Sequence, residues 1–236
     1  MIFSKASKTV LITGAAQGIG WATACWLAKN NFDLILLDKK RGTWQKKAKT
    51  LAEKEKITIQ TFVIDLEKVQ QIKKIATKLK NQRIDVLLNN AGVPLAGLLE
   101  TYQDQAIVKT LVVNLQATIL MSKYFLPNLK KSRGLIVNIS SGAGLEGKKE
   151  FSVYCASKFG VVGFGQSLAK DLKTVKVLTV TPGATNTALF KKAFKQGRQA
   201  LYQPEETAQI IGETISQQQK YKSGAVVDPF QHLERK

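Results

Sequence analysis

The sequence predicts an α/β protein, in which helices cover both faces of a doubly wound parallel sheet to give three layers in a single domain over residues 1–236. One observation behind this prediction is the regular alternation of short apolar runs with stretches of helical periodicity. The other is that a glycine or polar residue follows several of the apolar runs, namely Gly14, Asp38, Asp65, Asn90, Ser141 and Gly183. Parallel strands end at one edge of a sheet, so these residues are expected to gather where such sheets bind ligands.

The chain up to Gly92 is expected to form four strands and three helices. Short apolar runs predict strands at 8–13, 32–38, 57–64 and 84–88. Apolar positions at helical spacing predict helices at 19–30, 43–55 and 69–80, of which the second carries many lysines on its outer face. The fourth strand runs directly into the sequence Asn-Asn-Ala-Gly at 89–92.

The remainder of the chain continues this alternation. A long helix is expected from Tyr102 to Lys131 with an interruption at Pro127, because proline lacks the amide that a helix interior needs. Strands are expected at 134–140, 175–181 and 224–227, with a helix carrying Tyr154 between the first two and another starting at Pro204. The segment at about 188–203 is expected to form a lid over a substrate.

The composition limits the classes of function that fit. Thirty-six Lys and Arg against 17 Asp and Glu give a net charge of +19, which could serve nucleic acid, an anionic membrane surface or an acidic substrate. The lysines are scattered over predicted helix faces with little aromatic interleaving, so a solvated surface is favoured and nucleic acid is not expected. Cys25 and Cys155 lie in apolar helical patterns, which predicts neither disulfides nor a metal site. We expect a cytoplasmic protein without a membrane span.

A glycine-rich turn follows the first predicted strand. Gly14, Gly18 and Gly20 would let the backbone turn tightly and approach a pyrophosphate, while the following helix N-terminus supplies amides and a partial positive charge. The spacing G-x-x-x-G-x-G differs from the commoner G-x-G-x-x-G of dinucleotide-binding proteins. The turn therefore indicates a dinucleotide site only in combination with other motifs.

Asp38 ends the second predicted strand, twenty-four residues after Gly14. A carboxylate at this place hydrogen-bonds the adenosine ribose and repels a 2′-phosphate, which favours NAD over NADP. The neighbouring Lys39, Lys40 and Arg41 leave NADP as the alternative, since a basic side chain that folds back could hold that phosphate.

Tyr154 and Lys158 are spaced so that a helix places them one above the other. An ammonium about 4 Å from a phenol contributes about 4 kcal/mol at an effective dielectric constant of about 20. That interaction would lower the tyrosine pKa by roughly three and make the phenol a usable base, whereas burial would oppose it.

Taken together, the motifs T-G-x-x-x-G-I-G, N-N-A-G, a central Asn114, a serine thirteen residues before Y-x-x-x-K, and P-G resemble the classical short-chain dehydrogenase/reductase family. The resemblance covers Lys8 to Gly183 and implies a Rossmann fold. It implies a catalytic tetrad of Asn114, Ser141, Tyr154 and Lys158, with Ser140 as the alternative serine. It also implies that Asp65 contacts adenine, Asn90 the adenosine side and Thr187 the nicotinamide carboxamide. The full implied cofactor site is Gly14, Gln17, Gly18, Ile19, Gly20, Asp38, Asp65, Asn90, Ala91, Gly92, Tyr154, Lys158, Pro182, Gly183 and Thr187.

By this resemblance the expected activity is hydride transfer between a secondary alcohol or ketone and NAD, with Tyr154 as general acid and base. One alternative is an NADP-dependent carbonyl reductase. Another is a catalytically idle dinucleotide-binding protein that uses its basic surface to hold a partner. Family members often pair their long central helices, so a homodimer or homotetramer is expected, and the apolar residues of the Tyr154 helix would allow it.

The lid-like segment suggests a substrate class. It combines apolar and basic side chains, which could exclude water and grip a carboxylate or phosphate: Leu189, Phe190, Phe194 and Tyr202 with Lys191, Lys192, Lys195 and Arg198. The alternative is that these cations simply belong to the basic surface.

Overall fold

A computed structural model describes residues 7–193 and 199–228 and shows one parallel sheet of seven strands in the order β3-β2-β1-β4-β5-β6-β7. The strands are β1 (Thr9–Thr13), β2 (Asp33–Asp38), β3 (Ile59–Val63), β4 (Val86–Asn89), β5 (Leu135–Ile139), β6 (Lys176–Val180) and β7 (Val226–Val227). The α-helices are α1 (Gly18–Lys29), α2 (Trp44–Glu55), α3 (Val69–Lys78), α4 (Asp104–Leu111), α5 (Ala117–Ser132), α6 (Ser152–Asp171), α7 (Ala188–Ala193) and α8 (Pro204–Ser216). The predicted three-layer, doubly wound α/β fold is confirmed.

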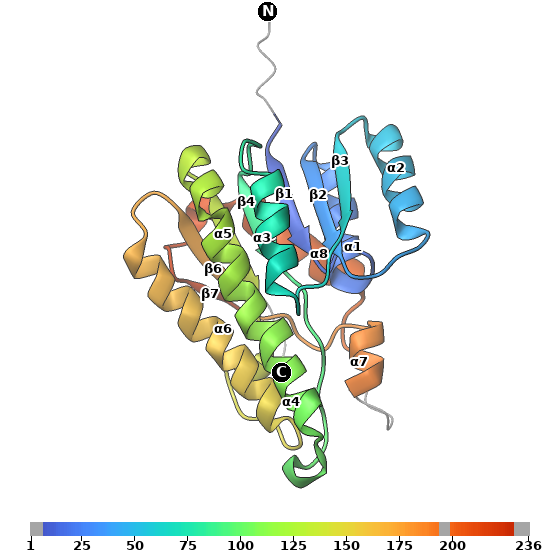
Figure 1. Cartoon of the computed structure of the whole chain (residues 1–236), viewed down its shortest axis with the longest axis vertical. Helices are drawn as coiled ribbons and strands as arrows, with labels where there is room; N and C mark the ends of the chain where they lie inside the picture. The colour runs from blue at the N-terminus through green and yellow to red at the C-terminus, as the bar shows by residue number, and fades with distance from the viewer. Residues whose placement is uncertain (1–6, 194–198, 229–236) are drawn as a thin grey trace, which may run out of the picture.

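Alternate residues of each strand enter two separate cores, one on each face of the sheet. From β1, for example, Val10 and Ile12 pack with the α1, α2 and α8 side, whereas Leu11 packs with the α3 and α5 side. Figure 1 shows the two helical layers, with α3, α5 and α6 in front of the sheet and α1 and α8 behind it. Burial on both faces explains why the strand sequences are continuous apolar runs rather than alternating ones.

The order of the strands reverses between β1 and β4. β1 pairs with β2 on one side and with β4 on the other, and Ile12 lies opposite Leu88 near the carboxyl ends of both strands. The loops leaving these two strands therefore diverge to opposite faces and open a crevice between them, which is where ligands bind in sheets of this kind. The glycine-rich turn and the Asn-Asn-Ala-Gly sequence form its two sides.

The prediction of a helix interrupted at Pro127 is wrong. α5 continues through Pro127 to Ser132. Pro127 and Lys123, whose carbonyl loses its amide partner, are both exposed, so water can satisfy that carbonyl. Beyond Pro127, the buried Asn128 side chain donates to the carbonyls of Leu79 and Gln82, both at 2.9 Å, and this tertiary contact holds the last turns in place.

The irregularity in this long helical stretch lies instead at Val112–Gln116, which forms a π-helical turn between α4 and α5. Such a turn inserts one extra residue and is frequently found at functional sites. It carries Asn114 and turns this side chain toward the loop that follows β4, where it contacts Val93. Residues 112–116 contain no proline or glycine that would have indicated this π-helical turn.

One helical stretch, Asp104–Ser132, has the length and apolar composition that a membrane span requires, with a mean hydropathy of 1.2. In the fold it packs against α3, α6 and the strands β4 and β5. Its apolar residues Met121, Phe125 and Leu129 are completely buried in the core. Part of its apolar composition therefore serves the core of the fold.

Candidate active site

A cleft of about 1000 Å³ lies at the carboxyl ends of the strands, where Figure 1 shows α4 and α7 beyond the sheet. All fifteen residues of the implied cofactor site line this cleft, and so does Ser141. Asn114 does not line it but lies directly behind Gly92, which does. The topology thus brings together residues that are up to 173 positions apart, from Gly14 to Thr187.

The glycine-rich turn has the geometry that a bound pyrophosphate requires. Gly14 has φ +67°, and a Cβ there would come within 2.9 Å of the Ala91 backbone. At Gly20 a Cβ would lie only 2.2 Å from the Gly14 carbonyl oxygen, so neither position accepts a side chain. The Asn90 amide donates to the carbonyls of Thr13 and Gly14, which ties this turn to the end of β4. The turn fits a dinucleotide because it lines the cleft and leads into α1, whose N-terminal amides carry a partial positive charge.

Asp38 lies at the end of β2 with both carboxylate oxygens engaged by the backbone. They accept from the amides of Ala16 at 2.9 Å and Lys40 at 2.8 Å. Lys40 extends over the glycine-rich turn, where its ammonium donates to the Gln17 side chain. The predicted carboxylate therefore lies beside the turn, and one of the three neighbouring cations lies there too.

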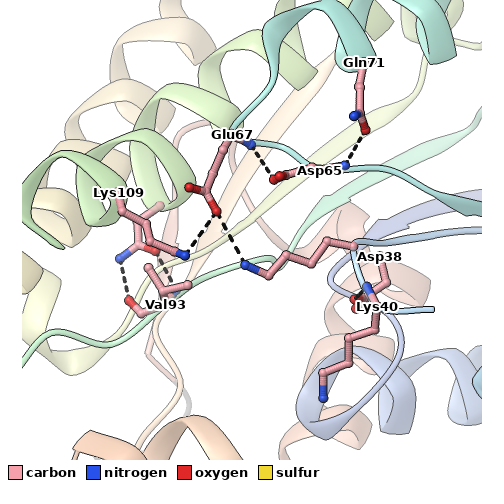
Figure 2. A network of polar contacts seen from close by, with 9 residues as sticks. Asp38, Lys40, Asp65, Glu67, Gln71, Val93 and Lys109 are labelled. Atoms are coloured by element: carbon pink, nitrogen blue, oxygen red, sulfur yellow. Dashed lines mark hydrogen bonds and ion pairs between the residues drawn. The ribbon is translucent and has the colours of Figure 1, made fainter. Parts of the chain in front are cut away.

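A second acidic side chain, Asp65, lines the same cleft as Asp38. Asp65 accepts from the backbone amide of Glu67 at 3.0 Å and is itself held by Gln71, whose side chain accepts from the Asp65 amide at 2.7 Å. Figure 2 shows Glu67 projecting from this loop between Lys109 of α4 and the end of β2 at Asp38. Its carboxylate pairs with Lys39 at 3.5 Å and with Lys109 at 3.4 Å.

Tyr154 and Ser141 form the centre of the opposite end. The Ser141 hydroxyl lies near enough to the phenol to lower its pKa, and it accepts from the Ala143 amide at 3.2 Å. Ser140 instead donates to the Lys158 carbonyl at 2.9 Å and is buried. Of the two serines, the geometry therefore brings Ser141 to the tyrosine and uses Ser140 to hold helix α6 against β5.

The prediction that Lys158 lowers the pKa of Tyr154 is wrong for this structure, in which that pKa is raised. Burial against Phe151 and Cys155 raises the pKa of Tyr154 to about 12, which the nearby Ser141 hydroxyl only partly opposes. Burial also lowers the pKa of Lys158 to about 8. The Lys158 ammonium lies 5.8 Å from the centre of the tyrosine ring and donates to the Ile139 carbonyl at 2.9 Å. Desolvation is the largest cause of both pKa shifts.

The buried Asn114 side chain is fully hydrogen-bonded. Its oxygen accepts from the Val93 amide at 2.8 Å, and its nitrogen donates to the Val93 carbonyl and to Ser157 on α6. A Cβ on Gly92 would lie 3.4 Å from the Asn114 oxygen and 3.7 Å from the Lys158 ammonium. Asn114 therefore fixes the loop after β4 against the helix that carries Tyr154 and Lys158.

Thr187 closes the cleft from the side of α7. Its methyl group would lie 3.2 Å from a Cβ on Gly18, and its hydroxyl accepts from the Phe190 amide at the start of α7. Pro182 and Gly183 line the floor of the cleft after β6. The region beyond Tyr154 is lined mainly by apolar side chains, among them Leu145, Phe151, Leu189, Phe190 and Leu201.

The basic residues of the lid-like segment do not line the cleft where the structure describes them. Lys191 and Lys192 are exposed and are not among the residues that line it. Phe194, Lys195 and Arg198 lie outside the described residues. Lys148 does line the cleft, but its ammonium is paired with Glu146. Among the described residues, no group of three His, Cys, Asp or Glu side chains could hold a metal ion.

Sequence reasoning missed two residues that organise the site. Thr13 accepts at its hydroxyl from the amides of Asn90 and Ala91 and so aligns the two sides of the crevice. Its position at the end of an apolar run was the available signal. Glu67 pairs with cations from two other segments, Lys39 and Lys109, and no spacing in the sequence predicts that contact.

The chain matches the family model described as short chain dehydrogenase over residues 8–198. It is 32% identical over 234 residues to the 3-oxoacyl-[acyl-carrier-protein] reductase FabG of Thermotoga maritima, which covers 93% of this chain and 95% of that protein. It is 35% identical over 226 residues to the human estradiol 17-beta-dehydrogenase 11, which covers 92% of this chain and 74% of that protein.

Solved structures agree with these relatives. A short chain dehydrogenase of Shigella flexneri complexed with NADP is similar with a TM-score of 0.87 and 28% identity, over 94% of this chain and 96% of that one. An NAD(P)-dependent gluconate 5-dehydrogenase assignment from Beutenbergia cavernae, with bound NADP, gives a TM-score of 0.86 and 27% identity over 96% of each chain.

Proposed function

Because the chain belongs to the short chain dehydrogenase family and is thus an oxidoreductase that acts on CH–OH groups with NAD(P), we propose that it interconverts a secondary alcohol and a ketone with Tyr154 as general acid and base. The observation that carries this proposal is that Ser141 and Tyr154 line the same cleft together with Lys158, which lies one helical turn from the tyrosine. Two hydroxyl groups that converge on one point can hold and protonate a substrate oxygen.

Each residue of the site has a separate part in this reaction. Ser141 holds the substrate oxygen, and Tyr154 gives it a proton in reduction or takes one in oxidation. Lys158 binds the ribose beside the tyrosine, and Asn114 keeps the loop after β4 and helix α6 in register. Thr187 orients the carboxamide of the nicotinamide. The dinucleotide supplies the hydride, and the chain supplies binding, orientation and the proton.

The raised pKa of Tyr154, about 12, bears on the direction of proton transfer. A phenol with this pKa is protonated at neutral pH and is ready to donate to a carbonyl oxygen. Oxidation of an alcohol requires the phenolate, so its rate is expected to rise with pH, while the protonation of Tyr154 leaves the rate of reduction unchanged until the pH approaches 12.

For the cofactor we favour NAD. The Asp38 carboxylate is fixed beside the glycine-rich turn, where it can accept from the ribose hydroxyls and repel a 2′-phosphate. The second candidate is NADP, because the Lys40 ammonium lies at Gln17 on the same turn and similar structures from Shigella flexneri and Beutenbergia cavernae contain NADP. The fixed negative charge at the ribose is the stronger argument for this chain.

The substrate end of the cleft suits an apolar molecule that carries one carbonyl or hydroxyl group. Its walls are mainly leucine and phenylalanine side chains, and Lys148 is already paired. A human relative is named for estradiol, a steroid alcohol, which agrees with such a pocket. We therefore prefer a neutral substrate to the anionic one that the basic lid suggested. The segment at about 188–203 remains the proposed lid.

The remaining proposals concern the setting of the enzyme. Cys25 and Cys155 are free thiols, which agrees with a reducing cytoplasm. Apolar side chains on α4, α5 and α6 are exposed, as a homodimer or homotetramer built on these helices would require: Val108, Leu111, Ile119 and Phe159.

The test is Tyr154→Phe, which removes one oxygen. We expect turnover of any accepted ketone or alcohol to fall by about 100-fold or more, with the affinity for the dinucleotide preserved. Turnover is measured by nicotinamide absorbance on a panel of apolar ketones and secondary alcohols, and binding by titration calorimetry. A variant that retains more than a tenth of wild-type turnover would remove Tyr154 from the mechanism.

A further inference from the structure

Glu67 joins three separate segments at the adenosine end of the cleft. Its carboxylate is held near the Asp65 loop by the hydrogen bond from its own amide to Asp65. One carboxylate oxygen pairs with Lys39, which directly follows Asp38 at the end of β2, and with Lys109 on α4. Figure 2 shows Glu67 beside the Asp65 loop, with its carboxylate paired to a basic side chain on each side.

Besides Lys40, Lys39 is a cation whose position matters for the cofactor. It lies next to the carboxylate that faces the ribose, and it lines the same cleft. A basic side chain at this place is what a 2′-phosphate would recruit. The pair with Glu67 instead directs the Lys39 ammonium away from Asp38 and toward the β3–α3 loop.

Glu67 also lines the cleft and carries a negative charge there. Together with Asp38 it places two carboxylates at the adenosine end of the cleft. A 2′-phosphate would have to displace Glu67 from Lys39 and would approach both carboxylates. The side chains of Lys39 and Glu67 are 50% and 31% accessible, so solvent screens their ion pair. The resulting discrimination against NADP is therefore expected to be modest.

We propose that Glu67 is a positioning residue for cofactor choice, which holds Lys39 away from the ribose and thereby favours NAD over NADP. This inference rests on the proposed function and extends it to a residue that no sequence motif marks. Glu67 acts through Lys39, while Lys109 fixes the carboxylate from the other side.

The experiment measures the dissociation constants of NAD and NADP by titration calorimetry for wild type, Glu67→Gln, Lys39→Ala and the double variant. We expect Glu67→Gln to tighten NADP binding by about threefold to tenfold and to change NAD binding by less than about twofold. In the Lys39→Ala background the same replacement is expected to tighten NADP binding by less than about twofold, because only the direct repulsion by the Glu67 carboxylate is then removed. The gain is expected to shrink as salt increases, because it comes from a freed cation.

The matched control is Glu53→Gln, which removes the same charge from an exposed ion pair with Lys49 on α2, away from the cleft. It is expected to leave both dissociation constants unchanged. An unchanged NADP to NAD ratio in Glu67→Gln, or a gain of the same size without Lys39, would overturn this inference and leave the proposed function standing. If the wild type binds neither NAD nor NADP, both this inference and the proposed function are wrong.

Discussion

At the scale of single residues, burial shifts the pKa values of the site. The Tyr154 phenol and the Lys158 ammonium are close enough to interact, yet burial raises the pKa of the first to about 12 and lowers the pKa of the second to about 8. Both shifts have the sign of desolvation, which disfavours the charged forms. At neutral pH the buried Lys158 ammonium therefore costs stability, whereas the neutral Tyr154 phenol does not.

The first prediction concerns this cost at Lys158. The pKa of Lys158 is about 8 in the folded state and about 10.4 in the unfolded chain. Below pH 8 this difference lowers the free energy of unfolding by its full amount of about 3 kcal/mol. The penalty decreases as the pH rises and is gone above about 10.4. Lys158→Met should thus raise the free energy of unfolding at pH 7 by about 1 to 3 kcal/mol, less what the lost hydrogen bond to Ile139 contributes.

Urea unfolding of wild type and Lys158→Met at pH 7, 8, 9 and 10 checks this prediction. The difference between the two should shrink across the upper part of that range. Lys170→Met, at an exposed lysine of the same helix, serves as the control and should change stability by less than about 0.5 kcal/mol at every pH. A difference that does not depend on pH would contradict the burial argument.

The second prediction concerns Asp38. Replacing Asp38 by Ser removes the fixed carboxylate and leaves Lys39 and Lys40 in place, so the NAD to NADP preference should narrow or reverse. Affinities for the two dinucleotides measured by calorimetry give the ratio, with Asp171→Ser at the far end of α6 as the charge control. If the ratio is the same in wild type and Asp38→Ser, then Asp38 does not select the cofactor.

At the scale of elements, strand order places the site and local irregularities shape it. β1 and β4 are neighbours whose following loops diverge, and the Thr13 and Asn90 side chains connect these loops. The π-helical turn at Val112–Gln116 then directs Asn114 to the loop after β4. The proline that seemed to break the following helix lies instead on its exposed side.

The third prediction tests this view of Pro127. Pro127→Ala restores a backbone amide opposite the Lys123 carbonyl and introduces a good helix former, so the free energy of unfolding should rise by about 1 to 2 kcal/mol. The loss of unfolded-state rigidity offsets part of that gain. Chemical denaturation provides the measurement. A clear loss of stability would mean that the proline ring makes packing contacts that the helix needs.

At the scale of the whole molecule, two features belong to the surface rather than to the cleft. They are the net charge of +19 and the exposed apolar side chains on α4, α5 and α6. α6 packs closely against the π-helical turn, since a Cβ on Gly160 would lie 2.7 Å from Leu115. Phe159, next to it, is 44% exposed. These helices thus present one surface on which a second copy can pack.

The fourth prediction is that the protein is a dimer or tetramer and that Phe159→Glu shifts it toward smaller species. A charge at the centre of an apolar interface has no partner there and opposes association. Light scattering after size exclusion measures the mass, and Val63→Glu, at a similarly exposed apolar residue on β3, is the control. A wild type that runs as a monomer at all concentrations would exclude this interface.

The sequence by itself determined the order of the elements, the glycine-rich turn and the candidate tetrad. These features depend on local spacing: an apolar run predicts a buried strand, Gly14 permits a positive φ, and residues 154 and 158 meet on any helix. The prediction of the sheet followed because alternating strands and helices have few other ways to bury their apolar faces.

The tertiary structure alone decided which features of the site the protein realises. The pKa values of Tyr154 and Lys158 depend on how tightly distant segments enclose them, and spacing carries no information on burial. Glu67 meets Lys39 and Lys109 because the sheet brings three loops to one edge. α5 continues through Pro127 because Asn128 docks on the loop after α3. In each case the deciding contact joins residues far apart in the chain, which local patterns cannot encode.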